Sequence, residues 1–280
     1  MLAKPKLGQN FLNDPEAIER IANALGDLSG RTVVEVGPGR GAITHALAAR
    51  AAHVLAIELD ADLAVRLRAD FDPARLTVVC RDVLTVDFAE AAEKYGLDGK
   101  LVLAGNLPYF ITSPILLKLA ASCASLDRAV LMVQREVAER VTAQPGSRDY
   151  GLLSVTVQMY GPAQLLFVLP PSAFTPPPEV HSAVFRWRFA PRFAELGVEE
   201  VSFLRFVRQC FAQKRKTLSN NLRAAGLAVE LIASVIKEAG LPAQARAEAL
   251  SIEDLARLAR ILQENGAAPQ SEAAPVVDPD

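Results

Sequence analysis

Between about residues 31 and 189, short runs of apolar residues, many of them β-branched, alternate with helix-like stretches. The predicted strands are TVVEV (32–36), HVLAIEL (53–59), RLTVVC (75–80), KLVLAGN (100–106) and RAVLMVQ (128–134). Helices are predicted at 41–51, near 61–70 and from about 113 to 122, and the segment up to about 96 has a looser pattern. Strands that are apolar on both faces and separated by helices indicate a parallel sheet covered on both sides.

The pattern changes in the second half of the chain. Strands predicted near 152–159, 164–169 and 180–189 follow one another closely, which indicates an antiparallel edge, and from about 198 onward the pattern is helical only. We therefore predict an α/β fold with a Rossmann-like, mostly parallel sheet and a small C-terminal all-helical domain. The expected parts are an N-terminal segment (1–30), a sheet domain (31–190), a helical domain (198–265) and a disordered tail (266–280), because the tail is acidic and rich in Pro and Ala.

Composition narrows the class of protein. With 51% hydrophobic and 22% charged residues, a packed globular core is expected. The chain has no apolar run of about 18 residues and no apolar stretch after its first lysines, so we expect neither a membrane helix nor a secretory signal. The three cysteines are far apart and the three histidines lack ligand spacing. These features favour a reducing cytoplasm and predict no disulfide framework and no metal site.

The net charge of −2 hides a basic region in residues 186–223. Three acidic residues there oppose nine basic ones, leaving 9 − 3 = +6. The basic residues are Arg186, Arg188, Arg192, Arg205, Arg208, Lys214, Arg215, Lys216 and Arg223. Because this local charge decides which partners are attracted, a polyanion is a possible ligand despite the overall balance.

A glycine-rich turn joins the first predicted strand to a helix in VVEVGPGRGAIT. Gly37 and Gly39 allow a sharp turn and a close approach of the backbone to a ligand, and Glu58, at the end of the second strand, can accept both hydroxyls of a ribose. Two cofactors are compatible with this pattern. Gly37, Gly39 and Ala42 satisfy the loose dinucleotide fingerprint, whereas Glu35-x-Gly37-x-Gly39-x-Gly41 resembles the first motif of S-adenosylmethionine (SAM) methyltransferases.

Two further strand ends favour SAM. Asp82, after the third strand, can accept a hydrogen bond from the adenine amino group of the cofactor, and GNLPY ends the fourth strand beside the expected methyl donor. Ligands of open α/β sheets gather at the carboxyl ends of the strands, and Gly37, Glu58, Asp82 and Asn106 all occur there on four successive strands. A buried-polar or capping role could explain any one of them alone, Asp82 most easily.

The NLPY stretch resembles the Asn/Asp-Pro-Pro-Tyr signature of enzymes that methylate exocyclic amino groups. The N6 lone pair of adenine is delocalised and therefore a poor nucleophile. Hydrogen bonds from N6–H to the Asn106 side-chain oxygen and the Leu107 carbonyl could hold the amine while it pyramidalises. Pro108 would keep that carbonyl aimed because its ring fixes φ, and Tyr109 would stack on the extruded base and favour its developing positive charge.

Several motifs together resemble the ribosomal RNA adenine dimethyltransferase family, closest to its bacterial small-subunit enzymes. Locally, NDP reads as a helix start capped by Asn13 or Asp14, and FTPPPEVHSAV (174–184) reads as a polyproline linker. The motifs that carry the resemblance are GQNFL, GPGRG, IELD, NLPY, YGLLSV, FTPPPEV and QKRKTLSNNL, within about residues 6 to 255.

The resemblance implies roles for individual residues. Asn10 and Leu12 would close the N-terminal segment over the methionine part of SAM, and Gly37 would lie against the cofactor. Glu58 would bind its ribose, Asp82 its adenine, and Asn106 would touch both methyl donor and target amine. Tyr109 and Phe174 would sandwich the flipped base. Phe110 departs from the family pattern, in which Asn is common after the tyrosine, and this affects how the wall behind the target pocket is built.

By the same resemblance, the substrate is 16S rRNA in the immature small ribosomal subunit. Two adjacent adenosines in the loop of the 3′-terminal hairpin would each receive two N6-methyl groups from SAM during ribosome biogenesis, in the cytoplasm, with no metal and no membrane. The protein is expected to act as a monomer. The basic segment QCFAQKRKTLSNNL, predicted to be helical, would dock RNA through phosphate contacts made by Arg208, Lys214, Arg215 and Lys216.

Three alternatives remain open at the level of sequence. A 23S rRNA methyltransferase of the macrolide-resistance type shares the sheet domain, although those enzymes usually have Ile at the position of Leu107. A non-catalytic nucleic-acid-binding relative would not need an intact NLPY and GPGRG. A nicotinamide oxidoreductase fits the glycine pattern alone.

Overall fold

The computed structural model describes residues 9–95 and 99–266 and forms two compact units. The sheet unit contains the described residues up to Ala138 together with Pro162–Ala190. The helical unit contains Glu139–Gly161 and the described residues from Pro191 onward. Apart from Gly266, the predicted disordered tail lies outside the described residues.

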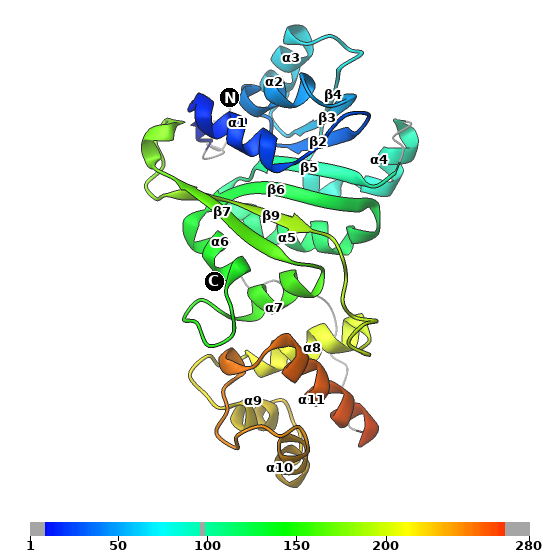
Figure 1. The fold of residues 1–280 in the computed structure, drawn as a ribbon, viewed down its shortest axis with the longest axis vertical. Coiled ribbons are helices and arrows are strands. Elements are labelled where there is room, and N and C mark those ends of the chain that lie inside the picture. The colour runs from blue at the N-terminus through cyan, green and yellow to red at the C-terminus, as the bar shows by residue number, and fades with distance from the viewer. Residues whose placement is uncertain (1–8, 96–98, 267–280) are drawn as a thin grey trace, which may run out of the picture. The chain divides into compact units, whose positions relative to one another are not determined.

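The sheet unit is built on a seven-stranded sheet with the order β4-β3-β2-β5-β6-β9-β7 (Figure 1). Its strands are β2 (Thr32–Val36), β3 (His53–Glu58), β4 (Leu76–Cys80), β5 (Leu101–Asn106), β6 (Leu126–Gln134), β7 (Ala163–Leu169) and β9 (Ser182–Arg188). The strands from β4 to β6 pair in parallel, and β9 pairs antiparallel with both β6 and β7. The predicted mostly parallel sheet with an antiparallel edge is confirmed.

Helices bury both faces of this sheet, as the continuous apolar runs of the strands predicted. The helices that begin in this unit are α1 (Pro15–Ala24), α2 (Ala42–Ala48), α3 (Ala61–Asp70), α4 (Phe88–Lys94), α5 (Thr112–Ala121) and α6 (Arg135–Thr142). Successive residues Val33 and Val34 of β2 point to opposite faces, and neither is exposed. The predicted start of α1 is also confirmed, because the Asp14 side chain accepts hydrogen bonds from two backbone amides of the first turn and Pro15 follows it.

The strand order gathers the ends of four strands along one edge. In the parallel registers, Val36 of β2 lies opposite Ile57 of β3 and Gly105 of β5, and Glu58 lies opposite Cys80 of β4. The chain runs outward from β2 to β4 and then returns to β5 on the other side of β2. This reversal makes the carboxyl edge between β2 and β5 the point where an open α/β sheet binds its ligand.

A second, two-stranded sheet joins the N-terminal segment to a distant loop. β1 (Phe11–Leu12) pairs antiparallel with β8 (Phe174–Thr175), with Leu12 opposite Phe174. The Asn13 amide donates to the Ala173 carbonyl at 2.9 Å. Both Leu12 and Phe174 are buried in the core of the sheet unit. This pairing holds the N-terminal segment beside the glycine-rich turn.

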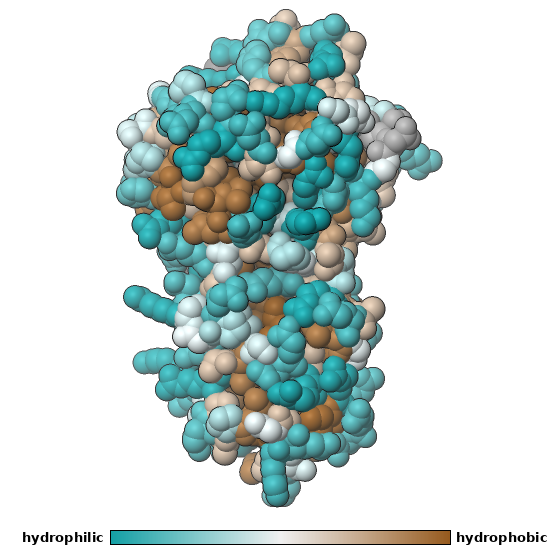
Figure 2. All heavy atoms as spheres, viewed as in Figure 1, coloured by the Kyte–Doolittle hydropathy of each residue, from teal (hydrophilic) through white to brown (hydrophobic). Residues whose placement is uncertain are grey.

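The edge strand β7 carries apolar side chains on its exposed face. Leu165 and Val168 are each more than a third exposed, and the Arg20 guanidinium lies over the neighbouring Phe167 ring at 3.8 Å from its centroid. Figure 2 shows apolar side chains gathered on the visible face of the sheet unit, on the side where β7 lies in Figure 1.

The helical unit contains α7 (Leu152–Met159), α8 (Glu200–Cys210), α9 (Leu218–Ala224), α10 (Val229–Glu238) and α11 (Ile252–Glu264). The strand predicted near 152–159 is wrong, since this segment is α7. The Ser154 hydroxyl donates to the Arg140 carbonyl and accepts from the Gly151 amide, while the Gln158 side chain donates to the Val141 and Ala143 carbonyls. These tertiary contacts override the β-branched composition that suggested a strand.

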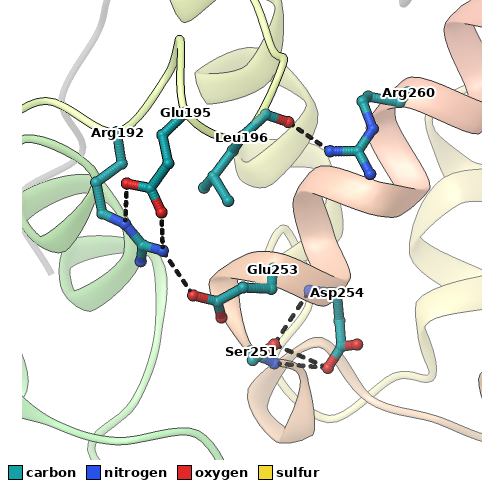
Figure 3. Close-up of polar contacts among 7 residues, drawn as sticks. All are labelled: Arg192, Glu195, Leu196, Ser251, Glu253, Asp254 and Arg260. Atoms are coloured by element: carbon teal, nitrogen blue, oxygen red, sulfur yellow. Dashed lines mark hydrogen bonds and ion pairs between the residues drawn. The ribbon is translucent and has the colours of Figure 1, made fainter.

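A cluster of charged side chains fixes α11 to the segment before α8 (Figure 3). The Arg192 guanidinium forms ion pairs with Glu195 at 3.1 Å and with Glu253, on α11, at 2.8 Å. Arg260, also on α11, donates to the Leu196 carbonyl.

Among residues 9–95 and 99–266, the structure has no helix with the length and apolarity needed to cross a membrane.

Candidate active site

A cavity opens at the carboxyl edge of the sheet unit, between β1 and the loops that follow β2, β3, β4 and β5. The structure brings together there all but one of the residues predicted to bind cofactor or to act in chemistry. Those lining the cavity are Asn10, Leu12, Gly37, Gly39, Glu58, Asp82, Asn106, Leu107, Pro108 and Tyr109.

The glycine-rich turn forms one wall of the cavity. Gly37 and Gly39 have φ values of 66° and 58°, in the left-handed region that side chains disfavour. A Cβ atom on Gly39 would lie 3.1 Å from the Phe11 ring, so the turn and β1 also approach each other too closely for a larger residue. The Arg40 guanidinium stacks over the same ring, 4.3 Å from its centroid. Phe11 and Arg40 were not predicted as site residues, because they acquire this role only through the fold.

Glu58 accepts hydrogen bonds from one backbone amide of the glycine-rich turn and one of the segment that follows β3. Its Oε2 accepts from the Gly39 amide at 3.0 Å, and its Oε1 accepts from the Asp60 amide at 2.9 Å. The residue is only 5% exposed. Because each carboxylate oxygen has two acceptor positions, these bonds still leave capacity for two hydroxyl donors. The residue therefore shapes the turn and can also bind a diol.

Asp82 is half-buried at the end of β4 and caps a short 3₁₀ turn, Val83–Thr85. Its Oδ1 accepts from the Leu84 amide at 2.9 Å. The capping role considered from the sequence is present, and it leaves the second carboxylate oxygen for another donor. Structural and ligand-binding roles are compatible at this position.

Asn106 ends β5 and contacts the N-terminal segment. Its Nδ2 donates to the Asn10 carbonyl at 3.0 Å, so Oδ1 is the side-chain atom that can accept a hydrogen bond from a ligand. The preceding Gly105 is required by space, because a Cβ there would lie 2.8 Å from the Val36 carbonyl oxygen. This close approach brings β5 beside β2 just where Asn106 reaches the cavity, a requirement that the sequence analysis missed.

The two residues after Asn106 are held by the protein core. The Leu107 side chain is buried, and its amide donates to the Met132 carbonyl at 2.9 Å. Pro108 has φ of −60°, and its carbonyl accepts from the Thr112 hydroxyl at 3.1 Å. The peptide of this motif is thus fixed before any ligand binds.

Tyr109 is anchored through its hydroxyl. Its Oη lies 2.6 Å from Oγ of the fully buried Ser182 on β9, within hydrogen-bond distance. Desolvation by burial raises the pKa of the Tyr109 hydroxyl, although the Ser182 contact partly opposes this. The neutral ring therefore has a fixed position on the cavity wall and can stack on a planar ligand.

Phe174 is the predicted site residue that does not line the cavity. It is 3% exposed and packs in the core, opposite Leu12 in the two-stranded sheet. Phe110, in contrast, was expected to affect a wall behind the target pocket but lies at the exposed margin of the cavity, with 64% of its surface accessible. The sandwich of Tyr109 and Phe174 is therefore not formed in this structure.

Glu35 is a buried carboxyl among the residues that line the cavity, and the sequence analysis gave it no separate role. It is 1% exposed, and its Oε2 has no hydrogen-bond partner among the described residues. Burial, and to a smaller extent the negative charge of Glu58, raise the pKa of its carboxyl to about 7. The nearby Thr44 hydroxyl has the opposite effect but makes no hydrogen bond of ordinary geometry with it. This acidic group is a candidate partner for a cationic ligand.

The basic run of the helical unit is a turn and not the predicted helix. α8 ends at Cys210 and α9 begins at Leu218, so Lys214, Arg215 and Lys216 lie between them, all exposed; Arg208 is exposed on α8.

The side chain of Asn221 holds this turn. It is 2% exposed, donates to the Cys210 carbonyl at 2.7 Å and accepts from the Gln213 amide at 3.1 Å. A buried amide that replaces the missing helical hydrogen bonds explains why the helix stops here. It also presents the cations of the turn to solvent.

Among residues 9–95 and 99–266, no group of three or more His, Cys, Asp or Glu residues could hold a metal ion. The groups that line the cavity include carboxylates, a side-chain amide, backbone carbonyls and aromatic rings.

Comparisons with known proteins place this site in a family context. A family model described as "Ribosomal RNA adenine dimethylase" matches residues 1–264. A protein of Acidobacterium capsulatum named "Ribosomal RNA small subunit methyltransferase A" is 55% identical over 262 residues, which are 93% of this chain and 92% of the relative. A protein of the same name from Koribacter versatilis is 46% identical over 265 residues, which are 91% of this chain and 93% of the relative.

Two solved structures share the fold. A dimethyladenosine transferase from Plasmodium falciparum has a TM-score of 0.78 with 23% identity, covering 91% of this chain and 98% of that chain. The 23S rRNA methyltransferase ErmE has a TM-score of 0.70 with 26% identity, covering 91% of this chain and all of that chain. The identity of the first is low enough that it supports the fold alone.

Proposed function

Because the chain belongs to the ribosomal RNA adenine dimethylase family, we propose that it dimethylates N6 of two adjacent adenosines in the 3′-terminal hairpin loop of 16S rRNA. The methyl donor is SAM, and the substrate is the immature small subunit in the cytoplasm. One observation carries the proposal. The Asn106–Tyr109 stretch lies in the same cavity as the ends of β2, β3 and β4, so a nucleoside cofactor and a target amine would meet there.

The residues present fit SAM. Glu58 has acceptor positions for the ribose hydroxyls, Asp82 retains a carboxylate oxygen for the adenine amino group, and the turn at Gly37 and Gly39 leaves space for the cofactor. The buried Glu35 carboxyl, whose Oε2 has no hydrogen-bond partner among the described residues, would ionise beside a cationic ligand and so favour its binding. When bound, SAM supplies an electrophilic methyl group. The N-terminal segment, through Asn10 and Leu12, would cover the methionine part.

Asn106 and Leu107 would hold the target amine. The Asn106 Oδ1 and the Leu107 carbonyl oxygen would accept the two N6–H groups, which turns the nitrogen lone pair out of conjugation and toward the methyl carbon. The fixed peptide at Pro108 would keep the carbonyl aimed. Tyr109, anchored on Ser182, would stack on the base and stabilise the positive charge that develops on N6. After transfer the cationic amine loses a proton to solvent, so no general base is required.

Phe174 would have to move before it could contact the target base. For it to form the second face of a base sandwich, its ring must turn out of the core packing that it has in the structure. Such a movement would make base binding the step that completes the pocket.

RNA docking is assigned to the helical unit. Lys214, Arg215 and Lys216 on the turn after α8, together with Arg208, would contact phosphates of the structured RNA. The protein is proposed to act as a monomer, with no metal and no membrane association.

The test is methyl transfer from labelled SAM to small subunits that lack the modification, followed by nucleoside mass spectrometry. We expect N6,N6-dimethyladenosine with the wild-type protein and none with Asn106→Ala, which removes the acceptor at the reacting amine. The matched control is Asn23→Ala, which removes an exposed amide on α1 and should leave transfer unchanged. Circular dichroism should be the same for both variants.

The same assay separates the alternatives. Primer extension places the modified positions, and methylation of 23S rRNA instead of 16S rRNA would support the macrolide-resistance type of activity. RNA binding without any transfer would indicate a non-catalytic relative. Calorimetry that detects NADH binding but no SAM binding would indicate an oxidoreductase.

A further inference from the structure

Phe110 is a large apolar side chain that the fold leaves in solvent at a functional position. Its 64% exposure is the greatest among the large hydrophobic residues of the described chain, and it lines the margin of the cavity directly after Tyr109. Within residues 9–95 and 99–266, no aromatic ring or cation stacks on it. An exposed aromatic ring beside a binding cavity indicates a ligand surface.

The backbone beneath the ring is fixed. Tyr109–Ile111 form a 3₁₀ turn that begins after Pro108. The Thr112 hydroxyl lies 3.1 Å from the Pro108 carbonyl oxygen and 3.4 Å from that of Tyr109, and the Ile111 amide donates to the Pro108 carbonyl at 3.2 Å. A ring carried by such a fixed backbone segment loses little conformational freedom on binding, so it is suited to stack on a ligand.

The occupant follows from base flipping, and this step rests on the proposed function. When one adenosine leaves the stacked strand to enter the cavity, the neighbouring base loses a stacking partner and exposes an apolar face. Phe110 directly follows Tyr109, the residue assigned to the flipped base, and consecutive Cα atoms are only about 3.8 Å apart. Phe110 is therefore close enough to contact the neighbouring nucleotide. Single-stranded nucleic acids are commonly held by aromatic side chains that stack on successive bases.

We propose that Phe110 stacks on the nucleobase adjacent to the flipped adenosine and thereby positions the second of the two target adenosines. Phe110 is a positioning residue that touches RNA but not the reacting atoms. While one adenosine occupies the cavity, Phe110 holds the next part of the strand at the margin. Loss of the ring therefore weakens RNA binding and uncouples modification of the two adenosines.

The experiment compares wild type, Phe110→Ala and Phe110→Trp on small subunits lacking the modification. Mass spectrometry of the excised RNA fragment counts methyl groups on each of the two adenosines. For Phe110→Ala we expect a KM for the subunit raised about tenfold, within the range for stacking of a base on an aromatic ring. The kcat for the first transfer should change less than threefold, and fragments with only one modified adenosine should accumulate. Phe110→Trp should behave as wild type.

Val65→Ala is the matched control, because Val65 is 61% exposed on α3 and does not line the cavity. All the variants should melt at the wild-type temperature, since they alter exposed side chains. The inference is overturned if Phe110→Ala keeps the wild-type KM and the wild-type distribution of products, or if Phe110→Trp shows the defect of Phe110→Ala. Absence of transfer by the wild-type protein would instead refute the proposed function.

Discussion

Glu35→Gln should stabilise the sheet unit in a way that depends on pH. Glu35 is on β2, 1% exposed, with an unpaired Oε2, and burial raises the pKa of its carboxyl from 4.5 to about 7. The native state therefore holds a proton that the unfolded chain releases between these two values. The contribution of Glu35 to native stability is highest below pH 4.5 and falls as the pH rises toward 7, because the carboxyl ionises more readily in the unfolded chain.

The magnitude follows from the same pKa. One pKa unit corresponds to about 1.4 kcal/mol. Relative to its value below pH 4.5, the contribution of Glu35 to the free energy of unfolding is therefore lower by about 1 kcal/mol at about pH 5 and by about 3 kcal/mol at about pH 8. Gln cannot ionise and removes this loss. The free energy of unfolding of Glu35→Gln, relative to wild type, should therefore rise by about 2 kcal/mol between these two pH values. Any cost of burying the amide is the same at both and cancels.

Urea unfolding followed by tryptophan fluorescence measures this difference, because the fluorescence reports on the sheet unit. Trp187 is the single tryptophan of the chain and is fully buried in β9 of the sheet unit. Parallel pH profiles for wild type and Glu35→Gln would refute the reasoning, because they would mean that Glu35 ionises as readily in the folded protein as in the unfolded one.

Two further predictions concern ligands. Glu58→Ala should raise the Kd for SAM at least about tenfold in calorimetry, since even one hydrogen bond to a charged group is worth about 1.5–3 kcal/mol; an unchanged Kd would contradict the ribose assignment. Replacing Lys214, Arg215 and Lys216, the three cations of the turn after α8, with Ala should weaken RNA binding. The slope of log K for RNA binding against log salt concentration should fall by about 2. Arg66→Ala, which removes an exposed cation of α3, is the control, and an unchanged slope in the triple variant would exclude the turn as a phosphate-binding surface.

Much of the candidate site was predictable because its positions depend on local signals. A strand that ends in a polar residue places that residue at the edge of the sheet, and the parallel registers bring the ends of β2, β3, β4 and β5 to one edge. For this reason the sequence alone predicts that Gly37, Glu58, Asp82 and Asn106 lie together, as they do in the cavity. The helix start at Asp14 was predictable for a similar reason, since capping involves residues only two or three positions apart.

Other features depend on contacts between distant segments. The 152–159 segment is buried over most of its length, so its apolar pattern cannot separate a strand from a helix, and side-chain bonds to the end of α6 decide for α7. Pairing with Leu12 places Phe174 in the core and away from the cavity. Asn221 ends the basic segment as a turn.

The amino-acid sequence by itself determined which chemical groups stand at the strand ends, because that ordering follows from residue spacing along the chain. Only the tertiary structure decided how water and neighbouring groups reach them. Burial gives Glu35 its raised pKa, Ser182 fixes the Tyr109 ring, and the exposed turn leaves Phe110 without a stacking partner in the part of the chain that the structure describes. Solvation and long-range packing depend on what surrounds a side chain in three dimensions, which residue spacing does not specify.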